Sequence, residues 1–218
     1  MSPRAVIIGP PGSGKSTVGP LLAAALGVPF RDCDDDIVAR TGRSISDIFA
    51  EDGEPAFRAL EEEAVAKALA DHDGVLSLGG GAPLTPGTRA RLAGHTVVFL
   101  NVGLAAGVQR TGLSSARPLL AGVNPRATFK KLLDERVPVY REVATVEVDT
   151  SRRSPNQVAR AVLEALGEQP AVETDDEPDD LTDRRTDDLL LPNPTFGGPP
   201  EIVPSEIVPV GDNEDRRR

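Results

Sequence analysis

The chain has few cysteines and few aromatic residues. Its 218 residues include one cysteine, one tyrosine and no tryptophan, and aromatic side chains make up 3% of the sequence. A lone cysteine, Cys33, excludes a disulfide within the chain and favours a reducing compartment. The N-terminal apolar run Ala5–Ile8 is too short for the core of a signal peptide. We therefore expect a cytoplasmic protein.

Long apolar runs and basic runs with aromatic residues are also absent from the sequence. No segment approaches the roughly 18 consecutive apolar residues that a membrane helix needs. No lysine- and arginine-rich run carries the aromatic side chains typical of nucleic-acid-binding surfaces. We expect no membrane and no nucleic acid among the partners, and a monomer that binds small molecules.

Negative charge is concentrated at the C-terminal end. Residues 168–218 contain 15 acidic and 5 basic side chains and so carry the net charge of −10 of the whole chain. Residues 1–167 are neutral overall, and the sequence pI of 4.8 describes the end segment. That segment is also proline-rich and lacks apolar periodicity, which is typical of disorder. We predict a folded domain over 1–167 and an acidic, disordered tail over 168–218 whose partners are unknown.

Apolar runs rich in β-branched residues recur along the first 167 residues, separated by segments long enough for helices. These runs are Ala5–Ile8, Val75–Leu78, Thr96–Leu100 and Thr145–Val148. The alternation predicts an α/β fold with a parallel sheet. The runs are continuously apolar rather than alternating, as expected of strands covered by helices on both faces.

Helix boundaries are marked by capping residues. The segment Lys15–Leu26 is followed by Gly27 and Pro29, a typical helix end. Glu54–Ala70 is rich in helix-forming residues and carries Pro55 where a first turn tolerates it. Two further helix starts are expected, at Ser44, where Asp47 resembles the partner in a capping box, and at Ser154 before Pro155.

The segment Gly9–Ser16 matches the phosphate-binding pattern G-x-x-x-x-G-K-[ST] in full, after a strand-like run and before a predicted helix. Glycines let backbone N–H groups face phosphate oxygens, the helix N-terminus adds a positive dipole, and Lys15 adds a charge. Ser16 is placed to bind Mg²⁺. The alternative is a glycine-rich turn that only caps a helix. The nucleotide-binding residues predicted here are Gly12, Ser13, Gly14, Lys15, Ser16 and Thr17.

A second acidic site follows at Asp32 and Asp34. If the strand from Pro29 continues to Asp34, a period of two places both carboxylates on one side and Cys33 on the other. Phosphoryl transfer needs a group that orients Mg²⁺ and one that orients or deprotonates the attacking hydroxyl. Alternatively, Asp34 and the two aspartates after it begin the next helix, where acidic residues favour the positive end. The spacing leaves both interpretations open.

Three glycines, Gly79–Gly81, follow the run Val75–Leu78 at the edge of the sheet where ligands of α/β proteins bind. They favour a close approach to the backbone over a plain tight turn. Guanidinium groups that can bind carboxylate or phosphate in forked geometry come from Arg58, Arg110, Arg117, Arg136 and Arg153.

The arginines also have ordinary interpretations. Arg58 has Glu54, Glu61 and Glu62 at helical spacing and can pair with them on the surface. The loop Gly112–Gly122 around Arg117 suits a lid that closes over phosphates, and a passive surface loop is the alternative.

Taken together, the motifs resemble those of the shikimate kinase family over residues 1 to about 167. The matching motifs are the phosphate loop at 9–16, Asp32-x-Asp34, Ser44-Ile-x-Asp-Ile-Phe49, Phe57-Arg58-x-x-Glu61, Gly79–Gly81, Arg117-Pro118-Leu119 and Glu135-Arg136-x-Pro-x-Tyr140. The resemblance implies a three-layer α/β/α P-loop kinase fold with a central five-stranded parallel sheet. It also implies ATP- and Mg²⁺-dependent phosphorylation of the 3-hydroxyl of shikimate, on the pathway to chorismate and aromatic amino acids.

The resemblance further implies a role for each site residue. Asp34 binds the substrate hydroxyls and acts as the base, and Lys15 and Arg117 stabilise the transferred phosphoryl group. Arg58 and Arg136 hold the shikimate carboxylate, Gly80 and Gly81 give backbone contacts, and Asp32 assists Mg²⁺ beside Ser16. Adenine contacts fall to Arg110, Arg153 and Pro155. One departure is Pro20, in place of a basic or polar residue, which predicts a bend near Gly19.

Two other functions are compatible with parts of the pattern. A gluconate kinase-like enzyme of the same fold would keep Lys15 and Ser16 without needing a carboxylate clamp of this form. A non-catalytic nucleotide-binding module with an interaction tail is disfavoured by the presence of Asp34, Arg58, Arg117 and Arg136.

Overall fold

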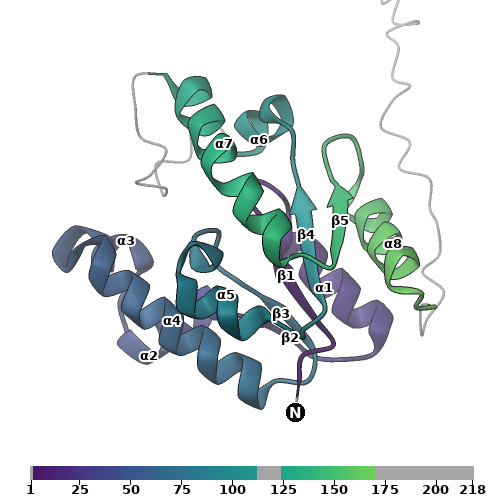
Figure 1. Ribbon diagram of the computed structural model, residues 1–218, viewed down its shortest axis with the longest axis horizontal. Coiled ribbons are helices and arrows are strands. Elements are labelled where there is room, and N and C mark those ends of the chain that lie inside the picture. Colours follow the sequence, from purple (N-terminus) through teal and green to yellow (C-terminus); the bar gives the residue numbers. More distant parts are fainter. Residues whose placement is uncertain (1, 112–123, 170–218) are drawn as a thin grey trace, which may run out of the picture. The chain divides into compact units, whose positions relative to one another are not determined.

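The computed structural model describes residues 2–111 and 124–169 (Figure 1). The predicted lid loop with Arg117, and all but the first two residues of the predicted tail, lie outside these ranges. The strands are β1 Ala5–Ile8, β2 Phe30–Asp32, β3 Val75–Ser77, β4 Val97–Asn101 and β5 Val146–Asp149. The helices are α1 Lys15–Leu26, α2 Cys33–Thr41, α3 Ile45–Glu51, α4 Gly53–Asp71, α5 Pro86–Leu92, α6 Leu104–Thr111, α7 Pro125–Val143 and α8 Pro155–Leu166, with a 3-10 turn η1 at Ala82–Leu84.

The five strands form one parallel sheet in the order β2-β3-β1-β4-β5. This confirms the predicted α/β fold and five-stranded parallel sheet. β1 lies at the centre, paired with β3 on one side and β4 on the other, so the glycine-rich loop after it opens at the middle of the sheet. Ligands of such folds bind at the carboxyl edge, near the point where the strand order reverses.

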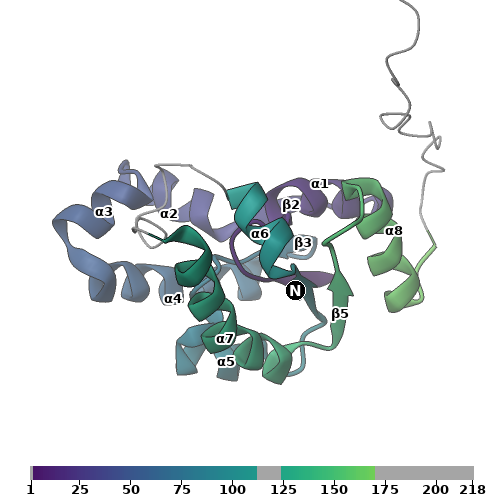
Figure 2. The same ribbon diagram turned by 90° about the horizontal axis from the view of Figure 1, so that it is seen from above.

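Helices cover both faces of the sheet, as Figures 1 and 2 show. Because side chains alternate along a strand, Ala5 and Ile7 of β1 pack with α1 and α8, while Val6 and Ile8 pack in the cluster that includes residues of α4, α5 and α7. All four are fully buried. The continuous apolar run in β1 therefore reflects a strand covered on both sides.

The predicted helix Lys15–Leu26 is confirmed at both ends. Gly14 precedes it and Gly27 follows it, both with left-handed backbone angles that favour glycine. The helix continues through Pro20 to Leu26. A Cβ at Gly19 would lie 2.3 Å from the ring of Phe30, so the absence of a side chain there lets β2 pack closely against α1.

The predicted strand through Asp34 is wrong, because β2 ends at Asp32 and α2 begins at Cys33. The Asp32 carboxylate accepts a hydrogen bond from the Asp34 backbone N–H at 2.9 Å and so caps the helix. Asp34 to Asp36 occupy the first turn, where the helix dipole favours negative charge. The alternative interpretation, a helix start at these aspartates, is therefore the correct local structure.

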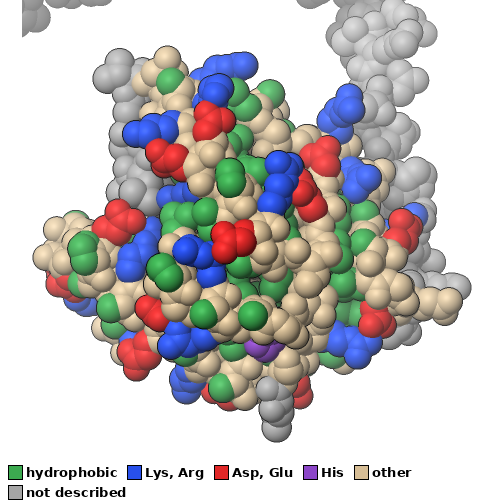
Figure 3. Space-filling view, in the orientation of Figure 1, with side chains coloured by type: hydrophobic (Ala, Val, Ile, Leu, Met, Phe, Trp, Pro, Cys, Tyr) green, Lys and Arg blue, Asp and Glu red, His purple; other side chains and the backbone are tan. Residues whose placement is uncertain are grey.

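Lysine, arginine and acidic side chains are interspersed on the face seen in Figure 3 rather than gathered by sign. Opposite charges pair across neighbouring elements, as Arg91 does with Glu62 at 2.6 Å. This agrees with the neutral composition of the first 167 residues. Within the described ranges, each helix is too short or too polar to cross a lipid bilayer.

Candidate active site

A cavity of about 580 Å³ lies among the glycine-rich loop, the first turns of α1 and α2, and side chains of α3, α4, α6 and α7. The predicted site residues that line it are Gly12, Gly14, Lys15, Ser16, Thr17, Asp32, Asp34, Arg58, Gly80, Gly81, Arg110 and Arg136. Ser13 is fully buried in the loop instead. Arg153 and Pro155 are not among the lining residues, and Arg117 lies outside the described ranges. One cavity thus collects predicted site residues from six separate segments of the sequence.

The glycine-rich loop has the backbone that an anion site requires. Gly12 and Gly14 take left-handed angles, with φ of 75° and 95°. The Lys15 ammonium donates to the Gly9 carbonyl at 2.8 Å and to the Pro10 carbonyl at 3.4 Å, so it lies across the loop. Because the first turn of α1 begins here, its N–H groups and dipole add to that charge. The arrangement suits a polyphosphate.

Two carboxyl groups face the cavity beside this loop. Asp34 is mostly buried, and its Oδ1 has no hydrogen-bond partner within residues 2–111 and 124–169. Burial, followed by the negative charges of Asp32 and Glu61, raises the pKa of Asp34 from 3.8 to about 6. Burial also raises the pKa of Asp32, although the Asp34 N–H bonded to it acts in the opposite direction. Asp34 thus has a carboxylate whose negative charge is destabilised and an oxygen, Oδ1, that is available to accept a hydrogen bond. These are the properties of a proton acceptor.

Arg58 of α4 is fixed by two glutamates one turn away. It donates to Glu61 at 2.6 Å and to Glu54 at 2.9 Å, while Glu62 pairs with Arg91 instead. Glu61 is only 1% exposed, so its pair with Arg58 is buried. Glu54 is 50% exposed, so its pair with Arg58 is the surface pairing that helical spacing also allowed. Arg58 is both ion-paired and a cavity residue. Sequence analysis treated Glu61 only as a motif member and a pairing partner.

The glycines after β3 leave room for side chains from other elements. A Cβ at Gly79 would lie 2.3 Å from Glu61 Oε1 and 2.8 Å from Asp34 Oδ1, and one at Gly81 would lie 2.3 Å from an Arg58 nitrogen. At Gly80 the nearest atom would be the Gly9 carbonyl oxygen, at 3.4 Å. In the structure the close approach at this segment is made by protein side chains. The predicted approach of a substrate to this backbone stays a prediction.

Alanine at Gly79 is expected to destabilise the protein by about 1–3 kcal/mol, because the new methyl group would displace the buried, arginine-bound Glu61. Alanine at Gly80 is the matched control, and it should cost under about 1 kcal/mol because its contacts are ordinary van der Waals distances. Thermal unfolding of both variants measures the difference. Equal losses would show that the space around Gly79 is not limiting.

Arg136 and Tyr140 of α7 reach the same glycine segment from the opposite wall. Arg136 donates to the Gly80 carbonyl at 3.1 Å, and Tyr140 donates to the same oxygen at 2.5 Å. The tyrosine contact was not predicted from the sequence. The available signal was that the only tyrosine of the chain lies one helical turn after a candidate site arginine.

Arg110 joins the phosphate loop to the segment after β5. Its guanidinium donates to the Thr150 carbonyl at 2.6 Å, to the Thr150 hydroxyl at 3.1 Å and to the Gly12 carbonyl at 3.4 Å. Arg110 also lines the cavity. It therefore lies at the end of the cavity formed by the loop, away from Arg58.

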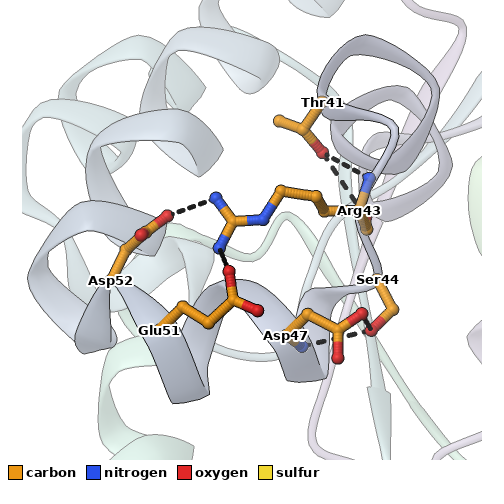
Figure 4. A network of polar contacts seen from close by, with 6 residues as sticks. All are labelled: Thr41, Arg43, Ser44, Asp47, Glu51 and Asp52. Carbon is orange, nitrogen blue, oxygen red and sulfur yellow. Dashed lines mark hydrogen bonds and ion pairs between the residues drawn. The ribbon is translucent and has the colours of Figure 1, made fainter.

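Helix α3 forms part of the wall on the Arg58 side through Ile45, Ser46 and Phe49. Figure 4 shows how its ends are held. Ser44 accepts from the Asp47 N–H at 3.1 Å at the start, and Arg43 pairs with Glu51 and Asp52 at 2.7 and 2.6 Å at the other end. One loop therefore braces both ends of a helix of 7 residues.

Comparisons with known proteins give one consistent result. The sequence model of the family described as "Shikimate kinase" matches residues 11–167. A shikimate kinase of Saccharopolyspora erythraea is 65% identical over 166 residues, which cover 76% of this chain and 95% of that protein. One of Mycobacterium tuberculosis is 58% identical and is covered to 94%. The solved shikimate kinase from Acinetobacter baumannii in complex with shikimate is 35% identical, with a TM-score of 0.73 over 76% of this chain and 93% of that one.

Proposed function

The chain belongs to the shikimate kinase family, and we propose that the cavity described above is where it transfers a phosphoryl group from ATP to shikimate. The protein is a kinase that phosphorylates shikimate in aromatic biosynthesis. One observation carries the assignment of the site: a complete phosphate loop and Asp34, a carboxyl group of raised pKa, share a cavity with three arginines, Arg58, Arg110 and Arg136. A gluconate kinase-like enzyme and a non-catalytic module, the two alternatives raised by the sequence, lack this support.

We assign the loop end of the cavity to the nucleotide. The phosphates would lie over Gly12–Thr17, with the Lys15 ammonium turned from the loop carbonyls toward the oxygens of the terminal phosphates. Adenine would lie toward Arg110, where Arg153 and Pro155 follow from the segment after β5. Arg117, in the predicted lid, would add a cation over the transferred group.

We assign the opposite end to shikimate. Arg58 and Arg136 would bind its carboxylate through forked, charge-assisted hydrogen bonds, and Gly80 and Gly81 would offer backbone groups beside them. Clamping the carboxylate fixes a rigid ring at the end remote from the reacting hydroxyl, so binding energy is used for orientation. Asp34 then lies between the clamp and the phosphate loop, where the hydroxyl has to be.

Kinases of this family are ATP-dependent and use a divalent metal, and we propose Mg²⁺ held by Ser16 and Asp32. The residues present fit it, because the hydroxyl and carboxylate oxygens lining this part of the cavity are the hard ligands that Mg²⁺ prefers. Two protein ligands leave positions for phosphate oxygens and water, which is the usual arrangement in phosphoryl transfer. When bound, the metal neutralises charge on the phosphates.

The chain's own contribution to the reaction is then position and one proton transfer. Asp34 Oδ1 accepts the proton of the attacking 3-hydroxyl, whose oxygen forms the new bond to phosphorus as the bond to ADP breaks. Lys15 remains beside the phosphates and offsets their growing charge. Glu61 holds Arg58 in place. Phosphorus–proton coupling in the NMR spectrum of the product tests the regiochemistry, and coupling to any ring proton other than that at carbon 3 would contradict it.

We further propose a cytoplasmic monomer in which residues 1–167 form the catalytic domain and 168–218 a separate tail. The unpaired, buried Cys33 supports the reducing compartment, since it is in no disulfide. Helix α8 ends at Leu166 and is capped by Gly167, which agrees with a domain boundary there.

Replacing either clamp arginine with alanine, Arg58→Ala or Arg136→Ala, is expected to raise the KM for shikimate by about 10- to 100-fold, because each loses charge-assisted hydrogen bonds to the carboxylate. The KM for ATP should change by less than about twofold, since neither side chain belongs to the phosphate loop. Steady-state kinetics with each substrate varied in turn measures both.

Arg91→Ala is the matched control for the clamp. It removes a guanidinium that is also paired with a glutamate, Glu62, but that lies outside the cavity. Its shikimate kinetics should match the native protein. Unaltered shikimate KM in both clamp variants would place the substrate carboxylate elsewhere.

A further inference from the structure

Tyr140, the only tyrosine of the chain, is buried beside the cavity without lining it. It is 0% exposed, and its ring is tilted against Phe99 of β4 with 5.1 Å between ring centroids. Its hydroxyl donates to the Gly80 carbonyl at 2.5 Å, the oxygen that also accepts from Arg136 at 3.1 Å. Two donors from one helix, one turn apart, therefore converge on a single backbone oxygen.

The donors hold the Gly80–Gly81 peptide in one orientation. In a planar trans peptide the carbonyl and the following N–H point in opposite directions. With the Gly80 carbonyl turned toward α7, the Gly81 N–H points away from Tyr140. Burial raises the pKa of Tyr140 to about 12, so the phenol stays protonated and remains a donor at neutral pH.

Arg136 alone would be a poor support for this peptide. Its guanidinium has two possible hydrogen-bond partners. In the structure it donates to the Gly80 carbonyl, and in the proposed complex it would donate to the carboxylate of shikimate. Charge-assisted bonds to a carboxylate are stronger than bonds to a neutral carbonyl. A half-buried carbonyl left without a donor costs free energy, and a second donor removes that cost.

We propose that Tyr140 is a positioning residue for shikimate, the phosphoryl acceptor. Its hydroxyl keeps the Gly80 carbonyl satisfied while Arg136 turns to the substrate carboxylate, and it keeps the Gly81 N–H in a fixed direction. This inference rests on the proposed acceptor site between Arg58 and Arg136.

Tyr140→Phe tests the proposal, because it removes the hydroxyl and keeps the ring against Phe99. The expected result is a rise of about 5- to 10-fold in the KM for shikimate, with kcat and the KM for ATP each within about twofold of the native protein. Val137→Ala, a loss of packing on the same helix against the same core, is the control. It should lower the melting temperature and leave the shikimate KM unchanged.

A matching rise in both KM values would overturn the proposal, because Gly80 also lies beside Gly9 of the phosphate loop and a merely structural role would affect both substrates. An unchanged shikimate KM in Tyr140→Phe would also overturn it. Native protein that is inactive with shikimate contradicts the proposed function instead, which separates the two failures.

The fluorescence of the native protein provides a second test that needs no turnover. With no tryptophan and one tyrosine in the chain, its tyrosine emission comes from Tyr140 alone, and Tyr140→Phe is the blank. Shikimate added without nucleotide is expected to change this emission saturably. If Tyr140→Phe does not fold, the titration of the native protein tests the proposal by itself. Unchanged tyrosine emission at saturating shikimate would overturn the proposal.

Discussion

Asp34→Asn is expected to lower kcat by about 100- to 10,000-fold, the usual contribution of general acid–base catalysis. The amide keeps the size of the side chain and removes the carboxylate that we propose accepts the proton of the hydroxyl. Nucleotide binding should stay within about twofold, since the proposed phosphate site is Gly12–Thr17 and does not include Asp34. Steady-state kinetics and calorimetric titration with an unreactive ATP analogue measure the two quantities.

Asp35→Asn is the matched control for this change. Asp35 lies next along the same first turn of α2 but is exposed and does not line the cavity. Its turnover should match the native protein. Near-native turnover of Asp34→Asn would reduce Asp34 to a positioning role and leave the reaction without a protein base.

The pH dependence follows from the raised pKa of Asp34, about 6 in the folded protein. Its carboxylate must be ionised to accept a proton, so kcat/KM for shikimate should fall as the pH drops through about 6. The stability effect has the opposite sign. Because the pKa is raised above the unfolded value of 3.8, ionising Asp34 costs folded stability as the pH rises from about 4 to above 6. Asp34→Asn should therefore be more stable at pH 8, by on the order of 3 kcal/mol.

Lys15→Met is expected to lower kcat by about 100- to 1,000-fold, the loss typical of removing one preorganised group that stabilises transition-state charge. The methionine keeps the unbranched stem and removes the ammonium. The same change leaves Asp32 and Asp34 without the positive charge that now lowers their pKa. The acidic limb of the pH profile should consequently move to higher pH, which a kcat/KM series over pH measures alongside turnover.

Lys67→Met controls for the loss of one positive charge. Lys67 is an exposed lysine of α4, paired with Asp71 at 3.7 Å and absent from the cavity. It should have native turnover and a native pH profile. A loss in Lys67→Met as large as that in Lys15→Met would mean that net charge, and not a cation at the phosphate loop, controls the rate.

The parts of the fold that local sequence signals determine were predictable. β1 and α1 were predicted with correct limits, because a continuously apolar run, a glycine-rich loop and a closing Gly27 mark their ends. Strands β3, β4 and β5 differ from the predicted runs by single residues at their ends, where hydrogen-bond pairing in the sheet decides the limit. The segment at Asp34 was less predictable, since a strand with a period of two and a capped helix start both suit alternating aspartates.

The interior of the site depended on contacts between distant segments. The Glu61 carboxylate lies close to Gly79, and Tyr140 donates to the carbonyl of Gly80, which is 60 positions away in the sequence. Spacing within one helix showed that Arg58 could pair with Glu61. It could not show that the glutamate is buried, because Glu61 lies against Gly79, a residue distant in sequence. Such contacts require the tertiary structure.

The most direct test of the account is the acceptor dependence of ADP release by the purified chain with ATP and Mg²⁺. Shikimate, gluconate, quinate and no acceptor would be compared in one coupled spectrophotometric assay. We expect a rate with shikimate that is well above the rates with the other acceptors and that with none. ATP binding without acceleration by shikimate, or a faster rate with gluconate, would contradict the proposed site and its chemistry.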